Sequence, residues 1–248
     1  MTQLFIDEYE VLLLDMGNTF MFGCDRFADS ESVVATYARL GGTAMSDEEL
    51  APAIVHLERQ ARKVGNDSAY FDNFPALIDI LRRTPAGTEA DEKELARLVQ
   101  VFALHERGTI ESQYADALHE LHRTHPLGLV SNILSPSGPF RESLRQAGVE
   151  DLFKVIVFSS DIGCIKPSVK PFEQALSAFD SPRDRVLYIG DTYKRDVVGA
   201  KSAGLDCVWI SRGREEPQGF EHKCDLIVTD LRELLDCSAR EADRIKDE

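Results

Sequence analysis

Carboxylate side chains come directly after two apolar runs of this sequence. Asp15 follows the run at residues 11–14, and Asp191 follows the run at 186–190, with Asp196 five residues further on. An apolar run that stops at an acidic residue predicts a buried strand. A carboxylate at the carboxyl end of a parallel strand lies where open α/β sheets bind their ligands. There it can act as a nucleophile or bind a hard cation such as Mg²⁺ through oxygen.

A hydroxyl group, an amide and a lysine occur between these acids. Ser131 and Asn132 end the apolar run that begins at Leu127, and Lys166 is followed by Pro167. The Ser131 hydroxyl and the amide of Asn132 can donate hydrogen bonds to a phosphate oxygen, although serine is common at strand ends. Lys166 can hold a phosphoryl group and offset the repulsion between neighbouring carboxylates. The alternative for Lys166 is a lysine in a surface loop.

Short apolar runs alternate with amphipathic helical patterns over the second half of the sequence. Together with the first run they predict strands at residues 11–15, 127–131, 155–159, 186–191, 207–210 and 226–228. The helical patterns cover residues 140–147, 171–179 and 195–203. Alternation of this kind predicts an α/β fold with a mostly parallel sheet, covered by helices on both faces.

The stretch between the first strand and the second has only helical patterns. Ser30 and Asp91 are placed to begin helices, residues 46–49 form a capping box, and residues 74–81 give a further apolar face. We therefore expect a Rossmann-like core formed by residues 1–21 and 115–248, with an inserted all-helical cap at residues 22–114. The cap should lie over the carboxyl edge of the sheet.

In chain order, the chemical stretches resemble the four signature motifs of the haloacid dehalogenase-like hydrolases, a superfamily that consists mainly of magnesium-dependent phosphatases. The motifs correspond to residues 11–19, 129–132, 163–167 and 189–196. The resemblance implies a helical cap of the C1 type and a substrate phosphoryl group carried on Asp15. It also implies that Mg²⁺ is held by Asp15, the backbone carbonyl of Gly17 and Asp191. Asp196 is suited to bind the metal, to bind a metal-bound water, or to contact the ligand residues without touching the metal.

Gly17 departs from this pattern. Most phosphatases of the family carry a second Asp there, which protonates the leaving group and then activates water. Glycine can do neither, and the neighbouring Asn18 can orient a water or a substrate but cannot exchange a proton. Loss of a general acid–base typically costs about 10² to 10⁴ in rate. Three accounts stay open: a good leaving group such as a sugar-1-phosphate or acyl phosphate, an acid from the cap such as Asp25, His105 or Glu106, or a weak enzyme.

The composition limits the classes of partner. The formal net charge of −15 and the pI near 4.9 argue against broad binding to nucleic acids or anionic membranes, since both need a basic face. The five cysteines are scattered, without zinc-site or redox-motif spacing. The sequence begins without a signal-peptide pattern and has no segment of transmembrane length. We expect a soluble cytoplasmic protein of open oligomeric state, with a surface helix in the charged segment after Leu235.

The leading hypothesis is a Mg²⁺-dependent phosphomonoesterase that acts on a small phosphorylated metabolite. A haloacid dehalogenase would use the same nucleophile without metal, but those relatives usually carry Tyr at the place of Gly17 and lack the acidic start of the fourth motif. A phosphonate hydrolase tolerates the loss of the second Asp but needs a cap lysine, and Lys63 and Lys93 have surface patterns. A low-activity regulatory homologue that binds phosphate or metal is the non-enzymatic alternative. Arg26 is the candidate for binding a substrate anion, with a surface salt bridge as its alternative.

Overall fold

The computed structural model describes residues 4–237 and is built on a six-stranded sheet in which all neighbouring strands are parallel. The order is β3-β2-β1-β4-β5-β6, so the first strand of the chain is central. The strands are β1 (Val11–Leu14), β2 (Leu127–Ser131), β3 (Phe153–Phe158), β4 (Val186–Gly190), β5 (Asp206–Ile210) and β6 (Leu226–Val228). The α/β class and all six expected strands are confirmed. The helix expected after Leu235 lies mainly outside the described residues.

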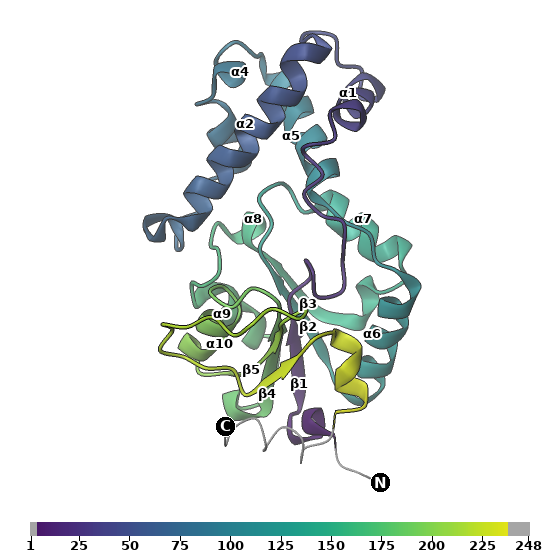
Figure 1. Cartoon of the computed structure of the whole chain (residues 1–248), viewed down its shortest axis with the longest axis vertical. Coiled ribbons are helices and arrows are strands. Elements are labelled where there is room, and N and C mark those ends of the chain that lie inside the picture. The colour runs from purple at the N-terminus through teal and green to yellow at the C-terminus, as the bar shows by residue number, and fades with distance from the viewer. Residues whose placement is uncertain (1–3, 238–248) are drawn as a thin grey trace.

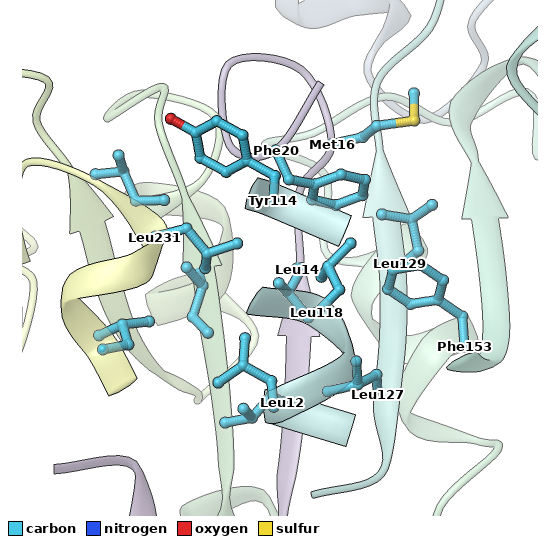
Figure 2. Close-up of a cluster of buried hydrophobic side chains, with 14 of the residues drawn as sticks. Leu12, Leu14, Met16, Phe20, Tyr114, Leu118, Leu127, Leu129, Phe153 and Leu231 are labelled. Atoms are coloured by element: carbon cyan, nitrogen blue, oxygen red, sulfur yellow. The ribbon is translucent and has the colours of Figure 1, made fainter. Parts of the chain in front are cut away.

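Side chains of the central strand alternate between the two faces of the sheet. Leu12 and Leu14 belong to one hydrophobic cluster, and Val11 and Leu13 belong to another. Figure 2 shows the first cluster, where Leu118 packs over Leu14. Burial on both faces explains why the strands are apolar throughout rather than alternating in polarity. The first face is covered by α6 (Ser112–Thr124) and α7 (Gly138–Gln146), and the second by α9 (Lys170–Leu176) and α10 (Val197–Ser202) (Figure 1).

All the helices between β1 and β2 except α6 lie together beyond the carboxyl ends of the strands (Figure 1). We call them the helical layer: α1 (Ser30–Arg39), α2 (Asp47–Asn66), α3 (Leu77–Leu81), α4 (Pro85–Thr88) and α5 (Glu92–Glu106). They pack around a hydrophobic cluster of their own, in which Leu57, Leu98 and Phe102 are buried. Leu134 and Ile165, from loops of the sheet, join this cluster and connect it to the rest of the molecule.

Two helix starts in this layer have the caps that the sequence predicts. The Glu49 carboxylate accepts a hydrogen bond from the backbone N–H of Ser46 at 3.1 Å, as in a capping box. The Asp91 carboxylate accepts one from the backbone N–H of Glu94 at 2.8 Å. These bonds satisfy donors that an α-helix leaves unpaired at its first turn.

The helix α3 is shorter than the pattern at residues 74–81 indicates, because it begins only at Leu77. Pro75 disfavours a helical conformation for the residue before it. The backbone N–H of Phe74 instead donates a hydrogen bond to the carbonyl of Gly163 at 2.7 Å. A tertiary contact with the third motif therefore replaces the first turn of the expected helix.

Shorter elements complete the described chain. They are α8 (Ser159–Ile162) and the 3₁₀ turns Phe5–Glu8, Ser68–Tyr70, Glu150–Leu152, Arg183–Arg185 and Leu231–Leu235. Within residues 4–237, every helix is too short or too polar to cross a membrane.

Leu118→Ala is expected to lower the free energy of unfolding by about 2 to 5 kcal/mol, because it leaves a cavity between α6 and the sheet. Leu118 is fully buried in the first cluster. Urea denaturation followed by circular dichroism measures the change. His119→Ala, at an exposed position on the same helix, is the matched control and should stay within about 0.5 kcal/mol of the wild type. A loss below about 1 kcal/mol for Leu118→Ala would contradict this account of the core.

Candidate active site

A cavity of about 160 Å³ lies at the carboxyl ends of β1, β2 and β4, between the sheet and the helical layer. Pockets for drug-sized ligands start at roughly 300 Å³, so this cavity suits a small molecule. The sheet and its loops contribute Asp15, Gly17, Asn18, Ser131, Asn132, Lys166, Asp191, Arg195 and Asp196. Cys24, Asp25, Arg62 and Glu106 line it from the helical layer and the segment that leads into it. The structure therefore brings together all candidate site residues except Arg26.

The Lys166 ammonium is wholly buried at the centre of the site. Its Nζ lies 2.8 Å from Asp15 Oδ1, 2.6 Å from Asp196 Oδ1, 2.9 Å from the Val130 carbonyl and 2.6 Å from the Tyr188 hydroxyl. Burial alone would lower the pKa of Lys166, but the two carboxylates outweigh it and raise this pKa above its usual value. The lysine is therefore a fixed positive charge beside the candidate nucleophile.

Asn132 holds the backbone of Lys166 rather than presenting a free amide to the cavity. Its Oδ1 accepts a hydrogen bond from the Lys166 N–H at 2.9 Å, and its Nδ2 donates to the Lys166 carbonyl at 3.1 Å. Both polar atoms of the side chain are engaged in this way. The loop after β2 and the third motif are thus joined residue to residue, which fixes where the Lys166 side chain begins.

Three carboxylates meet at the floor of the cavity. Asp15, Asp191 and Asp196 are buried, and each offers an oxygen within 4.8 Å of the others. Burial raises the pKa of the Asp191 carboxyl to about 7, with smaller contributions from the charges of Asp196 and Asp15. Burial also raises the pKa of Asp15, while Lys166 and a hydrogen bond from Ser131 oppose that rise.

This donor set fits a divalent metal ion. Three buried carboxylates face one buried ammonium, and the Arg214 guanidinium reaches Asp191 only at 3.4 Å, so negative charge is in excess at the cluster. Oxygen ligands of this kind suit Mg²⁺, which prefers one or two carboxylates together with waters and phosphate oxygens. Asp191 has only weak protein partners on its second oxygen, where Arg214 lies 3.4 Å away. Asp15, Gly17 and Asp191 all line the cavity.

Asp196 is already saturated with protein donors. Its Oδ1 accepts hydrogen bonds from Lys166 and from the Tyr188 hydroxyl at 3.0 Å, and its Oδ2 accepts one from the Thr192 N–H at 2.7 Å. Gly190 makes this packing possible, because a Cβ at residue 190 would lie 2.5 Å from the Asp196 carboxyl carbon. The geometry favours a place behind the ligands for Asp196, where it orients Lys166.

Comparisons with known proteins identify the family of this chain. The sequence model of the haloacid dehalogenase-like hydrolases matches residues 75–210, more than half of the chain. The protein belongs to this family. A glyceraldehyde 3-phosphate phosphatase from Pyrococcus furiosus is 27% identical over 87% of this chain and 92% of its own. A phosphoserine phosphatase from Thermus thermophilus is 38% identical, but over only 38% of each chain.

Solved structures show the same fold for this hydrolase. The magnesium-bound hydrolase YfnB from Bacillus subtilis superimposes with a TM-score of 0.60 at 22% identity and covers 92% of this chain and 97% of its own. A 2-haloacid dehalogenase from Pseudomonas syringae gives a TM-score of 0.66 at 20% identity, with the same coverage. Phosphatases and dehalogenases of the family share this architecture, so the fold alone does not choose between their reactions.

Two positions of the hydrolase differ from what the sequence suggests. Arg26 is not among the residues that line the cavity; its guanidinium donates to the Leu104 carbonyl at 3.2 Å. His105 is buried, but its ring nitrogens face the Arg26 carbonyl and the Thr36 hydroxyl rather than the cavity. Arg62 and Arg195 line the cavity instead. The sequence offered no sign of Arg62, because nothing in a helical pattern tells which surface arginine faces a site.

Two side chains hold the backbone of Asp191, one from β5 and one from the loop after it. Its backbone carbonyl accepts hydrogen bonds from the Trp209 indole at 2.9 Å and from the Arg214 guanidinium at 2.7 Å. The Arg214 guanidinium also lies 5.7 Å from the centre of the Trp209 ring. Like Tyr188, Trp209 belongs to a buried apolar strand, where its role in the site carries no signature in the sequence.

Glu106 ties the end of α5 to the loop after β2. Its carboxylate accepts hydrogen bonds from the backbone N–H groups of Leu134 at 2.6 Å and Ser135 at 2.9 Å, and from the Ser135 hydroxyl. Burial raises the pKa of Glu106 to about 7, although these hydrogen bonds lower it in part. The bonded loop begins with Ser131 and Asn132, so this carboxylate connects the helical layer to two residues of the site.

The pKa of Glu106 makes the stability of the hydrolase depend on pH. The folded-state value near 7 lies above the ordinary value of 4.5, so the folded protein binds this proton more tightly than the unfolded chain does. Stability must therefore fall as the pH rises through this window. Relative to Glu106→Gln, the wild type should lose about 2 kcal/mol of unfolding free energy between about pH 5.5 and about pH 8.

Urea denaturation of both proteins at a series of pH values measures this difference. Subtracting the variant removes the contribution of Asp191, which titrates in the same range. A difference between the two proteins that does not change with pH would contradict a raised pKa at Glu106.

Proposed function

We propose that this hydrolase is a Mg²⁺-dependent phosphomonoesterase that acts on a small phosphorylated metabolite. One observation carries the proposal: the Asp15 carboxylate is held by a buried ammonium within a cluster of three buried carboxylates. Such a site attracts both a divalent cation and the phosphoryl group that the cation and Lys166 together neutralise. The phosphatase names of relatives such as that from Pyrococcus furiosus support the same reaction class.

In the proposed reaction, a carboxylate oxygen of Asp15 forms a bond to phosphorus while the bond from phosphorus to the ester oxygen breaks. Lys166 opposes the effect of burial on the pKa of Asp15 and orients its carboxylate, and the Ser131 hydroxyl lies beside the same carboxylate. Water then attacks the phosphorus of the aspartyl-phosphate, which frees Asp15 and releases inorganic phosphate. Bound Mg²⁺ supplies charge neutralisation for the transferred phosphoryl group. Asp15, Asp191 and the Gly17 carbonyl are proposed to hold it.

We further propose the division into a core at 1–21 and 115–248 and a helical cap of the C1 type at 22–114. The two connecting segments run side by side: the backbone N–H and carbonyl groups of Phe22 and Thr109 exchange two hydrogen bonds of 2.8 Å. These residues lie within about five positions of the proposed boundaries. Arg62 and Glu106 of the cap reach the cavity, which supports a role for the cap in choosing the substrate.

The alternative reactions have less support. A phosphonate hydrolase needs a cap lysine at the reacting carbon, and within the described chain Lys166 is the one lysine that lines the cavity, so Lys63 and Lys93 do not supply it. A dehalogenase has no use for the unmatched acidic cluster. A cytoplasmic location and the absence of nucleic-acid and membrane partners stay expectations from the sequence, and the oligomeric state stays open.

Phosphate release from p-nitrophenyl phosphate and a panel of phosphorylated metabolites tests the proposal. Asp15→Asn should reduce release by more than about 10³-fold, because it removes the nucleophile. EDTA should abolish the wild-type activity, and added Mg²⁺ should restore it. Asp151→Asn, an exposed acid, is the control and should behave as wild type. Circular dichroism checks that each variant is folded. Wild-type rates in Asp15→Asn, or no phosphate release from any ester, would reject the proposed function.

Gly17→Asp tests whether the missing carboxylic acid limits the rate. A Cβ at residue 17 would have no atom within 4 Å, so the first atom of an aspartate side chain would meet open space. We expect the variant to hydrolyse alkyl phosphates faster, by up to about 10²-fold, and aryl phosphates at little-changed rates, since proton donation helps most when the leaving oxygen is basic.

Rates over a series of leaving groups decide between the open accounts. If Asp25 or Glu106, which both line the cavity, already donates the proton, the wild type will handle basic leaving groups and Gly17→Asp will be neutral or harmful. Equal sensitivity of the two proteins to the leaving group would reject the idea that Gly17 limits this enzyme.

A further inference from the structure

Arg195 is a cation in the cavity that no acidic group pairs with. Within the described residues its guanidinium makes one hydrogen bond, to Asn66 Oδ1 at 3.2 Å, and no ion pair. The side chain is half-buried, and burial lowers its pKa; the carboxylates of the cluster oppose this change from a distance, while the charge of Arg62 adds to it. A guanidinium has five N–H donors, so most of them are left for a ligand.

The side chain of Arg195 runs from the sheet to the helical layer. Its backbone lies in the loop after β4, but its guanidinium extends to Asn66 at the end of α2. The nucleophile and Lys166 line the same cavity at the ends of the strands. A substrate whose phosphate contacts Asp15 would therefore direct its opposite end towards the helical layer and Arg195.

Arg62 reaches the same cavity from α2, but it is already neutralised. Its guanidinium forms ion pairs with Asp25 at 2.8 Å and with Glu58. Arg62 lies one helical turn before Asn66, the residue that Arg195 contacts, so both guanidinium groups lie near the end of α2. Asp25 and Glu58 therefore compensate the charge of Arg62, and Arg195 supplies the positive charge that a ligand can use. A partly desolvated cation without a counter-ion attracts an anionic group of a ligand.

We propose that Arg195 binds a second anionic group of the substrate, so that the preferred substrates are small phosphate esters with a carboxylate or a second phosphate at the end opposite the reacting phosphoryl group. This inference rests on the proposed phosphatase function and narrows its substrate class. Arg195 would set specificity by a charge-assisted, two-pronged contact to that group. Phosphate esters of the same length whose opposite end is uncharged would leave the guanidinium unpaired and bind more weakly.

Calorimetric binding of non-hydrolysable phosphonates in the presence of Mg²⁺ tests the inference without turnover. Matched pairs differ only in a terminal carboxylate or methyl group: 3-phosphonopropionate against propylphosphonate, and 4-phosphonobutyrate against butylphosphonate. A diphosphonate of equal length shows whether a second phosphate serves better than a carboxylate. Among the probes with two anionic groups, the best should bind to the wild type at least about tenfold more tightly than its alkyl partner, as expected for a hydrogen-bonded charge pair.

Arg195→Gln should bring this affinity ratio to below about threefold. Lys194→Gln removes the same charge at an exposed neighbouring position and should keep the wild-type ratio. A ratio near one in the wild type, a full ratio in Arg195→Gln, an equal loss for both members of a pair or no binding of any probe would each overturn the inference. If Asp15-dependent phosphate release is seen at the same time, only the inference fails; if that release is absent, the proposed function fails.

Discussion

The buried ammonium of Lys166 is the interaction on which the rest of the site depends. Removing a charge from water costs several kcal/mol even after the protein relaxes, so Lys166 is tolerated only with close counter-charges. Asp15 and Asp196 provide them, and the Tyr188 hydroxyl and the Val130 carbonyl accept further hydrogen bonds. The same contacts that make the lysine stable in the interior also aim the carboxylate of Asp15. Stability and the proposed chemistry therefore share one set of atoms.

The protein's own cations balance the three carboxylates of the site only in part. Asp191 adds a third carboxylate, and burial raises its pKa to about 7 because no protein cation lies close enough to compensate it fully. Indole and guanidinium donors hold its backbone carbonyl, so its side chain stays directed into the cluster. Unmatched negative charge in the interior lowers the stability of a protein, and a divalent cation bound at this cluster would relieve that cost.

The helical layer shapes the other side of the cavity through few but well-buried contacts. Glu106 binds two consecutive N–H groups of the loop after β2, and Leu134 of that loop packs into the core of the helical layer. A shift of the layer would therefore move the loop that carries Ser131 and Asn132. Arg195 reaches in the opposite direction, from the sheet to the end of α2. Substrate choice and site geometry are coupled because both depend on how the layer lies over the strands.

The sequence alone determined the strands, most of the helices and the set of motif residues, because apolar periodicity and strand-end carboxylates are local signals. The roles of Asn132 and Asp196 required the tertiary structure, since both form hydrogen bonds that orient Lys166. The exclusion of Arg26 from the cavity and the presence of Arg195 at the helical layer were likewise decided by packing. Parallel strands bring together residues more than a hundred positions apart. The partner of a polar side chain there depends on strand order and helix packing, and no local sequence pattern contains that information.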